Sequence, residues 1–369
     1  MARKLRVACV GAGSVARWAH MPAYQAIGDI EIVAVSDVNV ERAKEMAASC
    51  DIPRSYETHQ EMFETEQLDC VSVCTPNAFH APVAVAALEA GIHVICEKPL
   101  ATTPADGAKM VAAAKKAGKN LMIGCQHRYR PEVQVLKDYV DLGRLGDVYY
   151  GRCGFVRRRG TPGVGGWFTT KELSGGGPLI DLGVHAFDLM MYVLGFPKPV
   201  SAAGKTFMKF ADLKRLKHVM SKARDGGKKR KLDVEDSGFG FVRLEGGLLI
   251  ELEASWALNL PGRRLFEIAG TAGGATLEPL TIYTEDGPYL VDIQPQVSKP
   301  KDPPRVLLFR EVMEAVRAGR VISYGEGALQ VLQVLDAIYR SSDEGKEVVI
   351  KNPAAVTVEP GQKKGKAGK

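Results

Sequence analysis

The stretch Leu5-Arg-Val-Ala-Cys-Val-Gly11-Ala-Gly13-Ser14-Val15-Ala16 runs an apolar, β-branched segment straight into a glycine-rich turn. Gly11 permits a tight turn, Gly13 leaves the backbone bare for a pyrophosphate, and Ala16 is small enough for the following helix to pack closely. The amino end of that helix offers N–H groups and a positive dipole to phosphates. This order of strand, turn and helix predicts a dinucleotide-binding unit, with the loop from Gly11 to Ala16 as its cradle.

Asp37 stands at the end of the next apolar run, 21 residues after Ala16. A carboxylate in this place accepts hydrogen bonds from the ribose of the adenosine half and repels a 2′-phosphate, so the sequence predicts NAD rather than NADP. Arg42, five residues later, is close enough in sequence to soften that preference. The alternative is that Asp37 only caps the helix starting near Asn39.

The first third of the chain alternates strand-like and helix-like segments. Its apolar, β-branched runs are Leu5–Val10, Glu31–Ser36, Cys70–Thr75, His93–Cys96 and Asn120–Cys125. Such alternation is typical of a parallel sheet with helices on its faces. We therefore expect an α/β Rossmann domain with a parallel sheet over residues 1–125.

From Val148 onward, longer strand-like runs follow one another without intervening helices. They cover Val148–Val156, Val200–Phe207, Ser237–Leu244, Leu248–Ala257, Arg264–Gly270 and Thr281–Tyr283, and Gly246-Gly247 is a hairpin signal between two of them. This pattern predicts an antiparallel sheet with one face exposed or covered by a partner. A large uncovered apolar face favours a homodimer or homotetramer. Amphipathic helices are expected over Val306–Arg317 and Gly327–Arg340.

Composition sets the class of protein. With 369 residues, 46% hydrophobic and 25% charged, the chain can build two cores. No apolar run is long enough to cross a bilayer, and the first ten residues lack a signal-peptide core, so we expect no membrane association. The seven cysteines are an odd number and lie mostly in apolar runs, which favours free thiols in a reducing cytoplasm. No Cys/His cluster has metal-site spacing, so we expect no metal.

The net charge of +6 is concentrated in two segments. Lys205–Lys231 holds eleven Lys and Arg against two Asp, and Gln362–Lys369 holds four Lys and no acid. Because the remainder of the chain is acidic, we expect no nucleic-acid partner and interpret these segments as a solvated insertion and part of a disordered basic tail over residues 353–369. The alternative is an anionic partner or a phosphorylated substrate.

Four further motifs follow the glycine-rich turn. They are Thr75-Pro76-Asn77-Ala-Phe-His80, Glu97-Lys98-Pro99, His127-Arg128-Tyr-Arg-Pro131 and Gly175-Gly-Gly-Pro-Leu-Ile-Asp181-Leu-Gly-Val-His185-Ala-Phe-Asp188. In order and spacing, the set resembles the glucose-fructose oxidoreductase / inositol dehydrogenase / MocA (Gfo/Idh/MocA) family of NAD(P)-dependent oxidoreductases. The resemblance covers roughly residues 5–350.

The resemblance implies that residues 126–352 form an α+β domain with a large, mostly antiparallel open sheet, which commonly serves as an oligomer interface. It also implies a dehydrogenase that oxidises a secondary hydroxyl of a sugar, glycoside or cyclitol. Lys98 and His185 would be its catalytic pair, and Asp181 would lie beside the substrate and the imidazole. The family resemblance further implies a cis peptide before Pro99. The cofactor cleft would be lined by Thr75, Pro76, Asn77, His80, Glu97, Lys98 and Arg128.

Alcohol oxidation gives independent reasons for these residue types. Removing a hydride and a proton requires a base near the hydroxyl and donors for the developing alkoxide. His185 titrates near neutrality and suits the base, while Lys98 suits a donor or a proton relay. Asp181 and His185 are four residues apart and share one face of a helix. The alternative is that Asp181 caps that helix and His185 is a buried, hydrogen-bonded histidine.

The loop before this helix supplies further substrate candidates. Trp167 offers an aromatic face to a sugar, and Arg157, Arg158 and Lys171 offer donors to hydroxyls or anionic groups. Their alternative role is that of ordinary solvated side chains. For Arg128 the alternative is a surface ion pair.

Two other functions remain open at this point. A glycosidase or lyase would keep NAD tightly bound and use transient oxidation to expel a glycosidic group by elimination, without net NADH. A redox sensor or scaffold would bind dinucleotide without turnover and use Lys205–Lys231 as a docking surface. The presence of both Lys98 and His185 argues against the second, because a non-catalytic binder needs neither.

Overall fold

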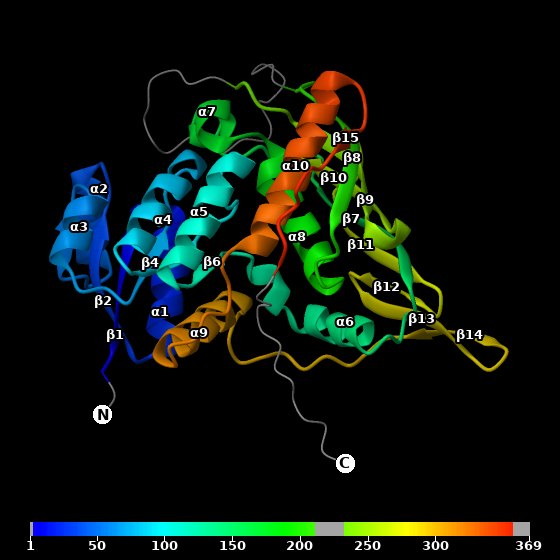
Figure 1. Ribbon diagram of the computed structural model, residues 1–369, viewed down its shortest axis with the longest axis horizontal. Helices are drawn as coiled ribbons and strands as arrows, with labels where there is room; N and C mark the ends of the chain where they lie inside the picture. The colour runs from blue at the N-terminus through cyan, green and yellow to red at the C-terminus, as the bar shows by residue number, and fades with distance from the viewer. Residues whose placement is uncertain (1–2, 211–231, 357–369) are drawn as a thin grey trace, which may run out of the picture.

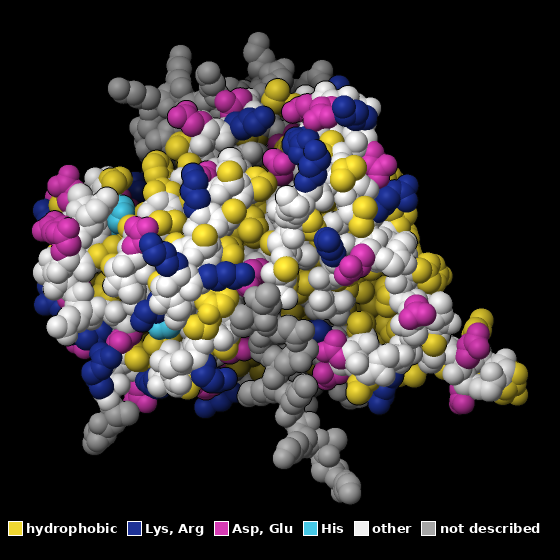
Figure 2. All heavy atoms as spheres, viewed as in Figure 1, with side chains coloured by type: hydrophobic (Ala, Val, Ile, Leu, Met, Phe, Trp, Pro, Cys, Tyr) yellow, Lys and Arg dark blue, Asp and Glu magenta, His cyan; other side chains and the backbone are white. Residues whose placement is uncertain are grey.

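The computed structural model describes residues 3–210 and 232–356, which form two sheets joined by packed helices (Figure 1). The predicted basic insertion falls mostly in residues 211–231, outside the described chain, and most of the predicted tail lies outside it too. On the face drawn in Figure 2, the Lys and Arg side chains of the described residues are scattered among Asp and Glu. No helix within the described residues is long and apolar enough to cross a membrane.

The first sheet has six parallel strands in the order β3-β2-β1-β4-β5-β6. Their bounds are β1 Leu5–Val10, β2 Ile30–Ser36, β3 Arg54–Tyr56, β4 Cys70–Val73, β5 His93–Cys96 and β6 Leu121–Ile123. The predicted Rossmann sheet is confirmed, with the three-residue β3 added. Because the strand order reverses between β1 and β4, a crevice for ligands opens at the carboxyl ends of these strands.

Helices cover both faces of this sheet (Figure 1). They are α1 Met21–Ile27, α2 Val40–Ser49, α3 His59–Thr65, α4 His80–Glu89 and α5 Pro104–Ala117. Local sequence explains the ends of α5: the Thr103 hydroxyl accepts a hydrogen bond from the Asp106 N–H at 3.2 Å, Pro104 occupies the first turn, and Gly118 takes a left-handed φ of 61°.

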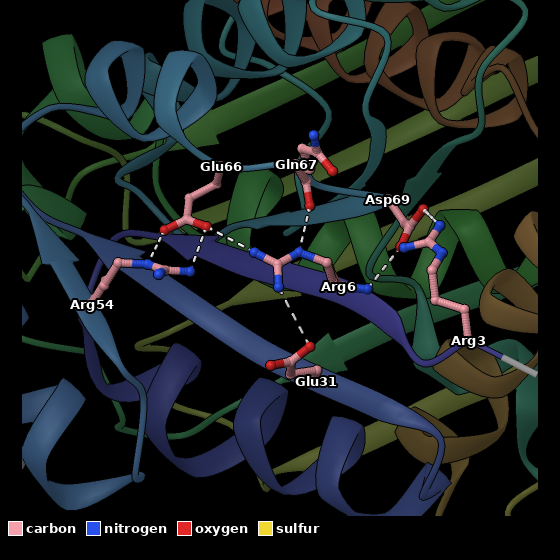
Figure 3. A network of polar contacts seen from close by, with 7 residues as sticks. All are labelled: Arg3, Arg6, Glu31, Arg54, Glu66, Gln67 and Asp69. Atoms are coloured by element: carbon pink, nitrogen blue, oxygen red, sulfur yellow. Dashed lines mark hydrogen bonds and ion pairs between the residues drawn. The ribbon is translucent and has the colours of Figure 1, made fainter.

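The opposite end of the sheet, away from the crevice, is held by an ionic network (Figure 3). The buried carboxylate of Glu66 contacts Arg6 at 2.9 Å and also Arg54, while Arg3 binds Asp69 with two hydrogen bonds. Glu66 and Asp69 precede β4, and Arg6 lies on β1, so the network fastens two neighbouring strands where they begin.

The second sheet has nine strands in the order β14-β13-β12-β11-β7-β10-β9-β8-β15. Their bounds are β7 Val148–Val156, β8 Pro199–Phe207, β9 Ser237–Leu244, β10 Leu249–Ser255, β11 Arg263–Gly270, β12 Gly274–Leu277, β13 Leu280–Asp286, β14 Tyr289–Ile293 and β15 Val348–Val349. All neighbours are antiparallel except β7 and β10, which confirms a mostly antiparallel sheet. The short strands β12, β14 and β15 were not predicted.

The remaining helices join the two sheets into one body. They are α6 Pro131–Asp141, α7 Lys171–Ser174, α8 Val184–Val193, α9 Pro304–Arg317 and α10 Glu326–Glu344. Helices α8 and α10 share a core with the second sheet and with α4 and α5. Helix α9 packs with α1 on the other face of the first sheet, through Phe309 and Val312. Helix α9, which lies within residues 126–352 of the sequence, therefore packs on the Rossmann domain.

Several large apolar side chains stay exposed on the second sheet. Tyr149, Phe241 and Tyr283 lie on β7, β9 and β13, and Tyr289 and Leu290 lie on β14. Beside them, Glu253 of β10 makes ion pairs with Arg152 of β7 and Arg263 of β11. The face of the sheet that carries Phe241 and Tyr283 is the one for which the sequence predicts a covering partner.

Candidate active site

The glycine-rich loop is closed toward the sheet and open away from it. Gly11 has a φ of 96°, and a Cβ there would lie 2.7 Å from the Cys74 carbonyl oxygen, so only glycine fits. At Gly13 a Cβ would meet nothing within 4 Å, which leaves free space on the outer side of the turn. Ala16 is fully buried and begins a π-helical turn that leads into α1. The loop thus has the shape that a pyrophosphate requires.

Asp37 supports this loop directly. Its carboxylate accepts hydrogen bonds from the backbone N–H of Ala12 at 2.9 Å and of Asn39 at 2.8 Å. The cap of α2 is Asn39, whose side chain accepts from the Arg42 N–H at 3.1 Å, so the alternative role of Asp37 as the helix cap is wrong. The Arg42 guanidinium lies 3.9 Å from the Asp37 carboxylate, which is the contact expected to soften discrimination between cofactors.

The Thr75 to His80 motif follows β4 and contains one unsatisfied group. The Thr75 hydroxyl is buried and has no hydrogen-bond partner among the described residues, and the Thr75 backbone nitrogen lies beside Gly11. Asn77 donates to the Ser174 carbonyl at 2.8 Å, which ties this edge to α7. His80 faces the carbonyl oxygens of Pro99 at 2.7 Å and Thr75 at 3.1 Å. The free Thr75 hydroxyl beside the open loop fits a bound dinucleotide, because it can hydrogen-bond to it.

Lys98 reaches across to the second domain. Its peptide bond to Pro99 is cis, as the family resemblance implies. The ammonium group donates to the Asp181 carboxylate at 2.7 Å and to the Asp181 carbonyl at 3.0 Å. The motifs Glu97-Lys98-Pro99 and Gly175 to Asp188 therefore meet at one point, although 83 residues separate Lys98 from Asp181.

Asp181 lies in a π-helical turn, Leu179–Gly183, that continues into α8. Its second carboxylate oxygen accepts from the indole N–H of Trp256 at 2.9 Å. Burial alone raises the pKa of the Asp181 carboxyl, but the Lys98 ammonium and the Trp256 hydrogen bond outweigh it and hold that pKa below its usual value. Asp181 is thus an ionised partner of Lys98 rather than of the imidazole. Trp256, at the end of β10, was missed by the sequence analysis.

The glycines ahead of Asp181 serve packing. A Cβ at Gly176 would lie 2.1 Å from the Tyr339 hydroxyl, and one at Gly177 would lie 2.1 Å from the Glu235 carbonyl. The Glu235 carboxylate accepts from the N–H groups of Gly177 and Leu179, so it caps the turn that carries Asp181. The side-chain-free backbone is needed for this close approach.

His185 is half-buried and lies against two rings. Its ring centroid is 5.0 Å from that of His127 and 6.4 Å from that of Phe155. No hydrogen bond to its imidazole is formed within the described chain, so the alternative of a hydrogen-bonded structural histidine is wrong. Burial and the positive charge of Lys98 hold the pKa of His185 well below its usual value. The imidazole is therefore neutral at pH 7, with its nitrogens available to a ligand.

The Glu97 carboxylate belongs to a buried network. Its carboxylate lies 2.9 Å from His20 Nε2 and 2.5 Å from Arg305 Nη1. His20 Nδ1 lies 2.8 Å from the Ser72 hydroxyl, which lies 2.8 Å from the Tyr24 hydroxyl. If His20 carries its proton on Nε2, it donates to Glu97 and accepts at Nδ1 from the Ser72 hydroxyl, which in turn accepts from the Tyr24 hydroxyl. His20 and Arg305 were not among the sequence candidates.

The Arg128 side chain is buried between helix α8 and two aromatic rings. Its guanidinium makes a buried two-pronged ion pair with Asp188 and lies over the rings of Tyr192 and Phe196. The surface ion pair considered for Arg128 is therefore wrong, since this pair is buried. The geometry favours a role in fixing α8, which carries His185, over a direct cofactor contact.

The four loop candidates are dispersed. Arg157 and Arg158 follow β7 and are exposed, and Arg157 donates to the Gly160 carbonyl at 3.0 Å. Trp167 stacks on Phe168 at 3.9 Å between ring centroids. The exposed Lys171 begins α7, and its backbone N–H donates to Asp233. Of these, only Arg157 lines a cavity next to the residues that surround Lys98.

Two family models match the chain. Residues 5–125 match an oxidoreductase family with an NAD-binding Rossmann fold, and residues 133–276 match the GFO/IDH/MocA C-terminal domain. The D-glucoside 3-dehydrogenase of Escherichia coli (strain K12) is 37% identical over 349 residues, which are 93% of this chain and 97% of that protein. The levoglucosan dehydrogenase of Pseudarthrobacter phenanthrenivorans is 29% identical, covering 73% of each chain.

The fold also matches solved structures. A levoglucosan dehydrogenase in complex with NADH and L-sorbose superposes with a TM-score of 0.81 and 23% identity, over 95% of this chain and all of that one. At this level of identity the match establishes a shared fold.

Proposed function

Because the chain belongs to the Gfo/Idh/MocA family of oxidoreductases, we propose that it is an NAD-dependent dehydrogenase of a sugar, glycoside or cyclitol. The observation that carries the proposal is the meeting of Lys98, Asp181 and His185 beside the dinucleotide-binding edge of the first sheet. A bound NAD would supply the hydride acceptor for the carbon that bears the substrate hydroxyl.

In this proposal His185 is the base. An uncharged imidazole is required to accept the hydroxyl proton, and burial together with the nearby Lys98 charge keeps His185 uncharged at neutral pH. The absence of a hydrogen-bond partner for the imidazole in the described chain leaves a nitrogen free for that proton.

Lys98 serves as the electrostatic partner of the reacting oxygen. Its ammonium is oriented by two acceptor atoms of Asp181, and its remaining N–H can donate to the alkoxide as negative charge develops. Asp181 acts through Lys98 and is in turn fixed by Trp256. It is therefore a positioning residue in this scheme, and not a second base.

The residues that would hold NAD are those with free space or free polar groups. They are the loop Gly11 to Ala16, Asp37 at the adenosine end, and Thr75 at the end of β4. The choice of sugar, glycoside or cyclitol follows from the relatives, since the Escherichia coli protein acts on D-glucosides according to its name. We place the substrate hydroxyl between Lys98 and His185.

The test is incubation of the full chain with NAD+ and a panel of glycosides, free sugars and inositols, followed by mass spectrometry and NADH absorbance. The expected result is a product two hydrogens lighter than the substrate, formed together with NADH. Lys98→Ala and His185→Ala should abolish this turnover while the circular dichroism spectrum stays unchanged. Near-normal turnover of folded Lys98→Ala would overturn the assigned roles. Release of an aglycone without NADH would instead support oxidation followed by elimination.

We further propose that the chain is a cytoplasmic homodimer or homotetramer assembled through the second sheet. The exposed side chains of Tyr149, Phe241 and Tyr283 provide apolar surface for a partner copy, and all seven cysteines are free thiols. Light scattering after size exclusion tests the assembly. Phe241→Glu should shift the mass toward that of a monomer. A wild-type chain that is already monomeric, or a Phe241→Glu variant that keeps the mass of the oligomer, would contradict this interface.

A further inference from the structure

A cavity of about 420 Å³ adjoins the site that holds Lys98 and His185. Its lining includes Leu182, which follows Asp181 directly, and Phe155, whose ring faces His185 at 6.4 Å between centroids. Its volume is within the range of roughly 300–1,000 Å³ that is usual for small-molecule sites. A ligand that presents a hydroxyl to His185 can thus extend into this space.

Three arginines, Arg157, Arg263 and Arg264, line this cavity. Arg264 lies directly opposite Phe155 in the β7 and β11 pairing, so both side chains project from the same face of the sheet. The Arg264 guanidinium lies over the Phe155 ring at 5.4 Å. Arg157 follows the last residue of β7 and also lines the cavity. In contrast, Arg263 is opposite Val156, and its guanidinium is paired with Glu253.

Arg157 and Arg264 have little negative charge beside their guanidinium groups. Within residues 3–210 and 232–356, Arg157 contacts no carboxylate, and its guanidinium donates only to the Gly160 carbonyl. Arg264 lies 3.7 Å from Glu278, whose carboxylate is held more closely by Arg130 at 2.7 Å. Asp181 is already paired with Lys98. This side of the site therefore carries an excess of positive charge.

The positive charge is felt at the catalytic centre. Burial, with the charges of Arg130 and Arg264, lowers the pKa of His127 to about 4. His127 lies against His185, with ring centroids 5.0 Å apart. Since Phe155 lines the cavity and its ring centroid is 6.4 Å from that of His185, one small substrate can reach both the cavity and the imidazole.

We propose that this cavity binds an anionic group of the sugar substrate, a phosphate or a carboxylate, through Arg157 and Arg264. Guanidinium groups bind both oxyanions with paired, charge-assisted hydrogen bonds. The inference rests on the proposed function, since the cavity selects among sugars whose hydroxyl is oxidised at Lys98 and His185. It places the physiological substrate among sugar phosphates or uronic acids rather than neutral sugars.

The experiment compares a neutral sugar with sugars that carry a phosphate or a carboxylate. Methyl glucoside, its 6-phosphate, glucose 1-phosphate and methyl glucuronide are assayed with the full chain and NAD+ at constant ionic strength. The expected result is a kcat/KM at least about tenfold higher for an anionic sugar than for methyl glucoside. The phosphate and carboxylate arms distinguish the two oxyanions.

Three variants locate the effect. Arg157→Gln and Arg264→Gln should each lower the ratio of anionic to neutral kcat/KM by about tenfold. Arg340→Gln, an exposed arginine on α10, is the matched control and should keep the ratio. Equal kcat/KM values for charged and neutral sugars in the wild type, or a ratio that Arg157→Gln and Arg264→Gln leave unchanged, would overturn the inference while the dehydrogenase proposal stands.

A binding measurement separates this inference from the proposed function. If no sugar in the panel is oxidised, titration calorimetry of the sugar phosphates and the glucuronide into the NAD-loaded chain decides the question. Tighter binding than methyl glucoside, lost in Arg264→Gln, would support the anionic subsite although turnover failed. Binding no tighter than that of methyl glucoside would refute it.

Discussion

Replacement of Arg305 by methionine tests the buried network behind Lys98. Arg305 on α9 is the only Arg or Lys in the described chain that makes an ion pair with Glu97, whose side chain is 9% exposed. Removing one partner of a buried ion pair costs about 3–5 kcal/mol, because a desolvated charge is left behind. Since the Arg305 side chain is itself 18% exposed and the His20 bond remains, we expect a loss of about 3 kcal/mol, the lower end of that range.

The pH dependence of this loss identifies its origin. Burial raises the pKa of Glu97, but His20 and Arg305 outweigh it and hold that pKa below the ordinary value of 4.5. A carboxyl with a lowered pKa in the folded state contributes stability above its unfolded pKa, and that contribution disappears as the pH falls. In Arg305→Met the Glu97 pKa returns toward its ordinary value. The difference from wild type should therefore be complete at pH 7 and should shrink below about pH 4.5.

Urea unfolding followed by tryptophan fluorescence at pH 7 and pH 4 measures both effects, provided that unfolding is two-state. The double variant Glu97→Gln with Arg305→Met is the control, because removing both charges should cost less than the sum of the two single changes. A loss below about 0.5 kcal/mol, additive single effects, or a pH-independent difference would refute the assignment of a coupled buried pair.

Three further outcomes follow from the geometry. The acid limb of kcat/KM in a pH-rate profile should lie below pH 6.5, because burial and the Lys98 charge lower the His185 pKa. A limb at or above pH 6.5 would contradict His185 as the base. His185→Asn should reduce kcat by at least about 100-fold. Gly176→Ala should lower the free energy of unfolding by about 2 kcal/mol, because its Cβ would clash with the Tyr339 hydroxyl. Gly13→Ala should leave the melting temperature unchanged and weaken NAD binding in calorimetry, because its Cβ meets no protein atom. The opposite pattern would refute the loop from Gly11 to Ala16 as the cradle. Glu66→Ala should lower the free energy of unfolding in urea by about 3 kcal/mol, because its carboxylate is buried. The control Glu31→Ala, at a half-exposed carboxylate, should lower it by less than about 0.5 kcal/mol. Equal losses would show that the network in Figure 3 is not held by the buried carboxylate.

Local sequence patterns were sufficient to predict the Rossmann sheet. The glycine spacing predicted the loop at Gly11 and Gly13, because the tight turn and the open backbone that a pyrophosphate needs both lie within one turn of the chain. Lys98 and His185 were identified by motif, and the structure brings both to Asp181. The short strands β3, β12, β14 and β15 were missed because segments of two to five residues show too little periodicity.

Partners distant in sequence could not be predicted in this way. Glu97 and Arg305 are 208 residues apart, and Asp181 and Trp256 are 75 apart, so no spacing rule connects them. Arg128 was predicted from the family resemblance to line the cofactor cleft, but its buried partner Asp188, 60 residues away, could not be identified from any spacing rule. Sequence patterns therefore indicate which groups a site contains, while tertiary packing decides which group faces which.

The return of the chain to the first sheet sets a limit on exchanging parts with relatives. Helix α9 packs against α1 and supplies Arg305 to Glu97, although some 180 residues separate it from the end of the Rossmann segment at residue 125. A chimera that replaces residues 1–125 alone would place a foreign surface under α9 and leave Arg305 without its carboxylate. The exchangeable module therefore has two pieces, residues 1–125 and 304–317, and recombination among members of this family should succeed when both come from the same parent.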